Sequence, residues 1–252
     1  MFFADRVNQL PLGVVGVAVG TALLPLMSRQ LSAADYKGAL TSQNRAIELS
    51  LFFTLPAAVG LVVLAEPTIS VLFERGAFDA VSARSTAEAL AMYAVGLPAY
   101  VVIKALVPGF FAREDTATPV KIAVFSLLIN VILNIILMDP FLHVGIAAAT
   151  AISAWCNALA LAFILKRRGY FALDKQNIVR LPRMLVISSL MGVVLFFSLM
   201  FLNKFFVYDS PIQLYILTIL VFVGLIIYFS FSFLLGAAKW SELKQLFQRK
   251  VT

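Results

Sequence analysis

Charged residues are scarce in this sequence: Asp, Glu, Lys and Arg make up only 13% of its 252 residues. A soluble globular domain has about 25%. Hydrophobic residues make up 62%, more than one water-soluble domain of this length can bury, and the mean hydropathy is +0.96. This composition excludes a cytosolic enzyme, a disordered chain and a nucleic-acid-binding domain, despite a net charge of +7. It predicts an all-α fold, that of a polytopic helical membrane protein, with no nucleic-acid partner.

Cysteine and histidine are nearly absent as well. The single cysteine, Cys156, lies within an apolar stretch, which excludes a disulfide framework and a Cys-x-x-Cys metal pair. The single histidine, His143, cannot build a zinc site by itself. The sequence contains no Ser/His/Asp set, no HExxH, no Walker loop and no GxGxxG motif. We therefore expect that this chain is not an enzyme and has no catalytic residue, cofactor or firmly assigned metal site. We also expect that the chain itself does not drive transport with ATP.

Apolar stretches of about 20 residues are long enough to cross about 30 Å of hydrocarbon. None of those in this sequence alternates with the period of two that a barrel strand requires, and helices remain as the way to cross the membrane. We therefore expect seven transmembrane helices, at residues 7–27, 47–65, 87–111, 119–138, 144–165, 184–202 and 212–238.

The charges of the predicted loops alternate along the chain. The loops after spans one, three and five and the tail after span seven, with Lys121 at the start of span four, together contain 15 Lys and Arg residues, whereas the other loops contain only Arg75, Arg84 and Lys204. By the positive-inside rule, the first set of loops faces the cytoplasm. We therefore expect the N-terminus outside and the C-terminus inside, as an odd number of spans requires.

The most basic segment of the chain is its best linker. Residues 167–183 separate a five-helix part, residues 1–166, from a two-helix hairpin at residues 184–238. Residues 239–252 mix apolar and basic side chains in a pattern typical of an amphipathic helix on the anionic inner leaflet. Membrane lipids are therefore expected partners.

Two cationic residues at the edge of or deep inside the predicted spans are candidates for function, because charge is costly there and often functional. Arg6, beside Asp5 at the outer end of the first span, is either an interfacial anchor or a guanidinium that binds an anionic substrate from a polar cavity. Lys104 lies deep in the third span, where it either faces a cavity or helix interface or snorkels to the surface. Glu48 and Glu88 lie near the ends of their spans, so we expect both to be interfacial.

Three uncharged polar residues are close in the sequence of spans four and five. Asn130 and Asn134 are four residues apart, so they share one helix face, and Thr150 follows early in the next span. Interhelical hydrogen bonding is one interpretation. The alternative is that their oxygens coordinate a hard cation such as Na⁺, which would need help from another helix because no carboxylate is near in the sequence.

The last two spans are rich in aromatic residues. Phe196 and Phe197 lie in the sixth span, and Phe222 and Phe229 in the seventh. They are either ordinary lipid-facing surface or the wall of a groove for an acyl or isoprenoid chain.

Three segments of the sequence resemble one known family when taken together. They are FADRVNQLPLGVVGVAVGTALLPLMSR at 3–29, LFERGAF at 72–78, and KALVPGFFAREDTATP followed by VKIAVF at 104–125. This combination resembles the MurJ/MviN family of lipid II flippases, in the multidrug/oligosaccharidyl-lipid/polysaccharide exporter superfamily. Family members have fourteen spans, and this sequence looks like the eighth to the fourteenth.

The resemblance implies roles for several of these residues. The Ala-Asp-Arg of residues 4–6 is similar to a segment whose arginine lines the central cavity, which implies that Arg6 binds substrate. Lys104, chosen from its position in the span, would then either add positive potential or lock two helices together. The last two spans correspond to a helix pair that borders the groove for the lipid tail. The family also has an N-terminal lobe that this sequence lacks. Either a second polypeptide supplies that lobe or Met1 is not the natural start, and we expect the latter.

The function that follows is translocation of the undecaprenyl-pyrophosphate-linked peptidoglycan precursor across the bacterial inner membrane by alternating access. The residues leave Na⁺ coupling and the membrane potential open as energy sources. A related drug or polysaccharide exporter and a non-transporting lipid-binding subunit are the alternatives.

Overall fold

All regular structure in the described part of the chain is helical. The structure, a computed structural model, describes residues 1–76, 78–202 and 212–237. The elements are α1 (Phe2–Pro11), the π-helix η1 (Leu12–Gly16), α2 (Val17–Ser32), α3 (Tyr36–Val63), α4 (Ala65–Phe73), α5 (Ala80–Leu106), α6 (Pro108–Phe111), α7 (Ala117–Arg167), α8 (Lys175–Leu202) and α9 (Ile212–Leu234). The predicted all-α class is confirmed.

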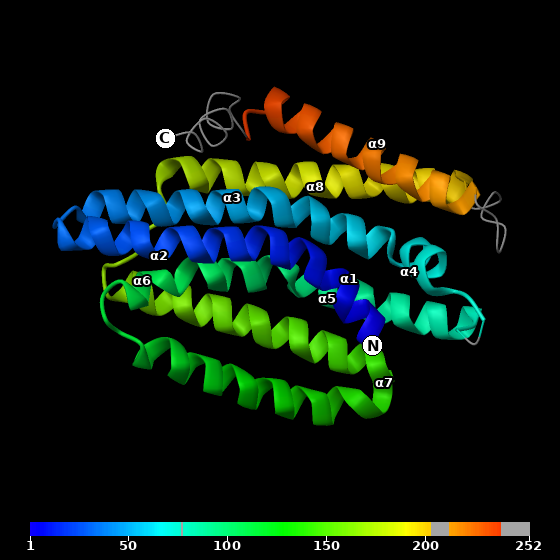
Figure 1. The fold of residues 1–252 in the computed structure, drawn as a ribbon, viewed down its shortest axis with the longest axis horizontal. Coiled ribbons are helices and arrows are strands. Elements are labelled where there is room, and N and C mark those ends of the chain that lie inside the picture. Colours follow the sequence, from blue (N-terminus) through cyan, green and yellow to red (C-terminus); the bar gives the residue numbers. More distant parts are fainter. Residues whose placement is uncertain (77, 203–211, 238–252) are drawn as a thin grey trace.

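Within these described ranges, six helices are long and apolar enough to cross a membrane, rather than the seven predicted. The difference lies in α7, a 51-residue helix that contains both the fourth and the fifth predicted spans. The backbone of α7 is non-helical at Leu142, and the chain reverses there into two limbs (Figure 1). Asn130 on the first limb donates a hydrogen bond to Ser153 on the second, so the limbs are in contact.

The reversal in α7 has a local cause in the sequence. Pro140 lacks the amide that an uninterrupted helix needs at that position. Leu142 has a φ of 50°, a region that is costly for a side-chain-bearing residue. Gly145 then lies so close to the Leu137 carbonyl that a Cβ at this position would overlap the oxygen. Glycine at 145 therefore allows the second limb to return along the first.

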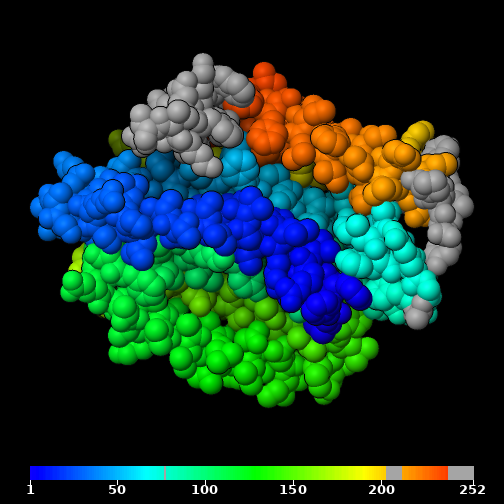
Figure 2. Space-filling model, in the orientation of Figure 1, coloured from blue at the N-terminus to red at the C-terminus, as the bar shows by residue number. Residues whose placement is uncertain are grey.

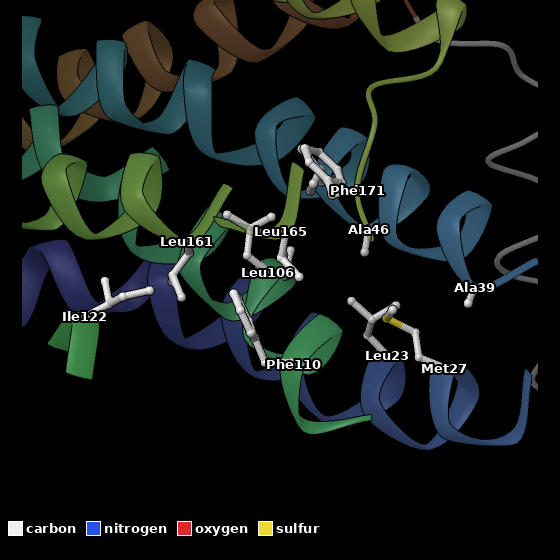
Figure 3. Packing of buried hydrophobic residues seen from close by; sticks show 12 residues of the cluster. Leu23, Met27, Ala39, Ala46, Leu106, Phe110, Ile122, Leu161, Leu165 and Phe171 are labelled. Carbon is white, nitrogen blue, oxygen red and sulfur yellow. The ribbon is translucent and has the colours of Figure 1, made fainter. Parts of the chain in front are cut away.

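Helix α5 is the centre of the bundle. It packs against α1, α3, α4 and α7. Its contact with α7 is close because small residues meet there: a Cβ on Gly96 would lie 3.0 Å from the Cα of Ala151. At one end of the bundle, Leu23, Phe110 and Leu165 bring α2, α6 and α7 together in one apolar cluster (Figure 3).

Helices α8 and α9 are attached to the bundle through α3 (Figure 1). A Cβ on Gly192 of α8 would overlap the Val59 side chain of α3, so the two helices are in close contact. From α9, the buried hydroxyl of Tyr228 donates a 2.7 Å hydrogen bond to the carbonyl of Phe52. Helix α8 begins at Lys175, inside the segment predicted as a basic linker. The predicted amphipathic tail lies outside the described residues.

One long helical run crosses the face of the molecule that Figure 2 shows. It consists of α1, η1 and α2, and its apolar window is only 17% buried. Val14 and Leu10 are among its exposed side chains. The predicted cation Arg6 lies near the start of this run, so its surroundings are those of an open face rather than of the protein core.

Replacing Gly145 with alanine should lower the free energy of unfolding by about 1–3 kcal/mol, because the new methyl overlaps a backbone oxygen that cannot swing aside. Thermal unfolding of the purified protein in detergent measures this. Gly60→Ala is the matched control, since nothing lies within 4 Å of a Cβ at that position. Equal melting temperatures for the two variants would contradict this account of the turn.

Candidate functional site

Arg6 lies on the exposed side of α1. Its guanidinium donates a 3.1 Å hydrogen bond to the side-chain oxygen of Gln9 and lies 5.0 Å from the centre of the Phe2 ring. The Asp5 carboxylate binds the other end of the same amide, because it accepts a hydrogen bond from the Gln9 side-chain nitrogen. Among residues 1–76, 78–202 and 212–237, no carboxylate forms an ion pair with Arg6. Its charge is therefore held in place but not neutralised.

Lys104 lies in the last turn of α5, before a short helix, α6, that continues the apolar segment to Phe111. The lysine is half-buried, and its aliphatic stem and ammonium lie over Gly16, the last residue of the π-helix. In the described part of the chain, no carboxylate forms an ion pair with Lys104 either. The contact with η1 places Lys104 at a helix interface, one of the positions predicted from the sequence.

Arg6 and Lys104 mark two levels along the same helical run. Ten residues separate Arg6 from Gly16, the glycine that Lys104 covers, which is about 15 Å of helix. The two cations are thus spaced along the helical run rather than gathered at one point.

The predicted polar cluster of spans four and five is brought together by the turn in α7. The Asn130 amide lies 3.2 Å from the Ser153 hydroxyl and 3.5 Å from that of Thr150. Asn134 donates a 3.0 Å hydrogen bond to the Asn130 side-chain oxygen. The Asn134 side-chain oxygen is buried and has no hydrogen-bond partner in the described part of the chain. The contacts of Asn130 with the hydroxyls are hydrogen bonds between the two limbs of α7, and the side-chain oxygen of Asn134 takes no part in them.

The four predicted groove phenylalanines do not share one environment. Phe196 and Phe197 are exposed on α8 and contact each other edge to face, and Phe222 is exposed on α9. Phe229 is half-buried, and its ring packs against Phe52 of α3. The first three rings can therefore reach lipid, whereas Phe229 helps to attach α9 to the bundle.

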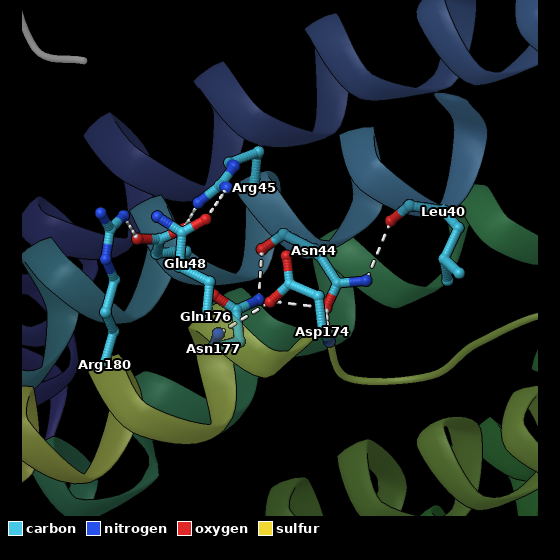
Figure 4. A network of polar contacts seen from close by, with 8 residues as sticks. All are labelled: Leu40, Asn44, Arg45, Glu48, Asp174, Gln176, Asn177 and Arg180. Atoms are coloured by element: carbon cyan, nitrogen blue, oxygen red, sulfur yellow. Dashed lines mark hydrogen bonds and ion pairs between the residues drawn. The ribbon is translucent and has the colours of Figure 1, made fainter. Parts of the chain in front are cut away.

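The sequence analysis missed a buried ionic network between α3 and α8 (Figure 4). Glu48 pairs with Arg180 of α8 and with Arg45 one turn earlier on α3. The side chains of Glu48 and Arg180 are only 7% and 4% exposed. The sequence places Glu48 near the end of its span, and the structure adds that this carboxylate is buried, because α8 begins early enough to place an arginine directly over it.

Amides extend this network along the same two helices (Figure 4). Asn177 donates to both the backbone and the side-chain oxygen of Asn44, each at 3.0 Å, and Asn44 donates to the Ala172 carbonyl. One pattern in the sequence could have indicated this contact. Asn44 and Glu48 are four residues apart, and Asn177 and Arg180 are three apart, so each pair shares one helix face.

A further amide serves the break between α5 and α6. Pro108 lacks the donor that would continue α5, and the buried Gln43 lies at the break, with its amide nitrogen 3.3 Å from the Ala105 carbonyl and 3.4 Å from that of Leu106. Gly109 leaves the space that this amide occupies. The break that ends the helix bearing Lys104 is thus stabilised by α3.

The connection between α6 and α7 lies within the third segment of family resemblance, residues 104–125, and is held by polar contacts of Asp115. Asp115 accepts a 3.0 Å hydrogen bond from the amide of Thr118 and pairs with Arg168, at the far end of α7. The hydrogen bonds from Thr118, and then Arg168, lower the pKa of Asp115 to about 2. Asp115 therefore stays ionised at neutral pH, and it ties the first turn of α7 to its last.

This arrangement defines a class of protein. A bundle whose described part contains six helices long and apolar enough to cross a membrane is that of a multi-pass membrane protein. The match to the family model "Lipid II flippase MurJ", over residues 1–233, shows that the chain belongs to that family.

Curated relatives agree with the family match. The chain is 40% identical over 251 residues to the probable lipid II flippase MurJ of Rhizobium meliloti (strain 1021), and 34% identical over 241 residues to that of Rickettsia prowazekii (strain Madrid E). These alignments cover 99% and 95% of this chain, but only 47% and 48% of the relatives. The chain therefore spans about half the length of the curated relatives that it matches.

A solved structure has the same fold. Lipid II flippase MurJ in an inward closed conformation matches this chain with a TM-score of 0.74 at 28% sequence identity. The match covers 91% of this chain and 45% of that one. The helical arrangement described above is thus that of about half of a flippase.

Replacing Glu48 with glutamine should lower the free energy of unfolding by about 3–5 kcal/mol, because the buried Arg180 then loses its ion pair with the Glu48 carboxylate. Thermal or denaturant unfolding in detergent measures the change. The control is Glu88→Gln, which removes the exposed pair of Glu88 with Arg84 and should cost less than about 1 kcal/mol. A cost for Glu48→Gln no larger than that of the control would show that the network does not hold α8 to α3.

Proposed function

We propose that this chain forms the C-terminal lobe of a flippase that moves lipid II, the lipid-linked peptidoglycan precursor, from the inner to the outer leaflet. The chain acts as a transporter, not as an enzyme. Membership of the MurJ family and the relatives named as lipid II flippases support this proposal. The observation in the structure that supports it most is Arg6, an exposed and unneutralised guanidinium on a predominantly apolar helical run.

The physical problem in such transport is to move a pyrophosphate and its sugars through hydrocarbon. A guanidinium suits phosphate because its planar fork donates two hydrogen bonds at once. Gln9 and the Phe2 ring orient the Arg6 guanidinium in advance, which reduces the conformational entropy lost on binding. Lys104 of α5, which contacts the same run at Gly16, adds positive potential on the path of the headgroup.

The proposed partners follow from the same geometry. The chain spans about half the length of its relatives, and the open face of α1, η1 and α2 would face the other lobe across the headgroup path. The exposed Phe196, Phe197 and Phe222 would border the isoprenoid tail, which stays in lipid. Loop charges support an inner-membrane orientation with the N-terminus outside and the C-terminus in the cytoplasm.

The energy source is proposed to be a cation gradient or the membrane potential. The uncoordinated side-chain oxygen of Asn134, beside Asn130 and Thr150, is the kind of ligand that a hard cation prefers. Among the described residues there is no cluster of three or more His, Cys, Asp or Glu residues that could hold a metal ion. Uncharged oxygens of this kind suit Na⁺ better than a divalent ion.

The functional test is complementation in cells depleted of their lipid II flippase. This chain is expressed alone and together with the N-terminal half of the Rhizobium meliloti relative. We expect rescue only with both halves. In the rescued pair, Arg6→Ala should lower the rate of precursor translocation roughly tenfold or more, because a charge-assisted pair of hydrogen bonds is lost. Thr21→Ala, an exposed polar position on the same run, serves as the control. Normal translocation by Arg6→Ala would leave only the role of an interfacial anchor.

A separate measurement tests the cation site. Na⁺ at ten times its dissociation constant should stabilise the purified chain by about 1.4 kcal/mol, and an equal concentration of choline should not. The difference should vanish in the double variant Asn130→Ala/Asn134→Ala. Equal effects of the two salts on the wild-type melting temperature would reject Na⁺ binding.

A further inference from the structure

We propose that Gly16 is a positioning residue for Lys104. Because Gly16 has no side chain, the lysine packs directly on its backbone, a contact called here the Gly16 seat, and this contact directs the ammonium toward the path proposed for the headgroup along α1, η1 and α2. The inference rests on the proposed function, because it takes Lys104 as a group that attracts the anionic headgroup. The contact itself can be tested without transport.

The seat is defined by three close approaches. A Cβ on Gly16 would lie 2.8 Å from Cδ, 3.1 Å from Nζ and 3.3 Å from Cε of Lys104. The end of the lysine side chain, including its ammonium, therefore lies directly against the helix at the glycine. Any side chain at position 16 occupies the volume that the lysine now fills.

The contact is specific to one glycine of the run. Gly13 and Gly20 lie on the same stretch, and nothing is within 4 Å of a Cβ built on either of them. A general need for flexibility or for close helix packing would not distinguish Gly16 from these two neighbours. Only Gly16 has a side chain resting on it.

The π-helix determines which way Gly16 faces. Its hydrogen bonds join residues five apart rather than four, so it holds one extra residue compared with an α-helix. Residues that follow the insertion are therefore rotated by about 100° relative to an uninterrupted helix. The π-helix ends at Gly16, and this rotation is what turns the glycine toward α5 and Lys104. A π-turn in mid-helix is otherwise costly, and such turns are frequent at functional sites.

The charge of Lys104 remains available in this position. No carboxylate in the described ranges forms an ion pair with it, whereas other cations of the chain, such as Arg45, Arg168 and Arg180, each have one. A half-buried ammonium with no counter-ion, about 15 Å along the run from Arg6, suits a phosphate or diphosphate group. The contact with Gly16 therefore fixes the position along α1, η1 and α2 at which such a ligand would meet Lys104.

The first experiment measures the contact directly. The purified chain in lipid nanodiscs is treated with an acetylating amine reagent, and mass spectrometry follows modification of Lys104. Gly16→Ala should expose the amine, because the flexible end of the lysine moves aside more easily than the backbone, and modification should become several-fold faster. Gly13→Ala and Gly20→Ala should leave the rate unchanged. Equal rates in all four proteins would overturn the inference.

The second experiment uses the rescued two-half flippase and a double-mutant cycle. If Gly16 acts through Lys104, then Gly16→Ala and Lys104→Ala each slow translocation, and the double variant is no slower than Lys104→Ala alone. Melting temperatures close to that of the wild type show that the loss is not one of folding. Losses that multiply in the double variant would overturn the positioning role.

The same cycle distinguishes a failure of the positioning role of Gly16 from a failure of the proposed flippase function. Normal translocation by Lys104→Ala would overturn the positioning inference while leaving the flippase function intact. A failure of the paired halves to rescue, with the acetylation result as expected, would overturn the proposed function but not the Gly16 seat.

Discussion

Hydrocarbon offers no hydrogen bonds, so a chain that breaks its helices inside a membrane must provide its own partners. Helix α3 provides several of the polar partners that this chain needs. Gln43 serves the carbonyls at the Pro108 break, and Glu48 neutralises the buried Arg180. The turn in α7 is handled differently, since Asn130 joins the two limbs through side-chain hydroxyls. The elements that bear the proposed site are positioned by these internal contacts rather than by intrinsic helix rigidity.

Much of the fold follows from the sequence because the thickness of a membrane fixes the length of an apolar helix. The apolar stretches and the grouping of Asn130, Asn134 and Thr150 depend on local spacing, and spacing can be counted. The pairing of Glu48 with Arg180 was missed, since 132 residues separate them and the arginine lay in a segment interpreted as a linker. Only the helical spacing of each partner from a nearby asparagine pointed to it. The π-helix has no comparable pattern, because it depends on which helix face the tertiary contacts favour.

The cations of this chain fall into two groups that composition cannot separate. Arg45, Arg168 and Arg180 have carboxylate partners and fasten one helix to another or one turn to the next. Arg6 and Lys104 are held by an amide and by a glycine, which orient a side chain without cancelling its charge. An arginine near a span end looks the same in sequence in both groups. Only the packing shows which charges remain available to an anion.

The attachment of α9 through Tyr228 bears on how such a lobe moves. The hydroxyl reaches across to the backbone of α3 at Phe52, while Gly192 seats α8 against the same helix from another level. Together with the pair of Glu48 and Arg180, these contacts join α3 to α8 and α9 at three levels between residues 48 and 59. A tilt of α3 would therefore carry α8 and α9 with it, so that the three helices move as one rigid unit.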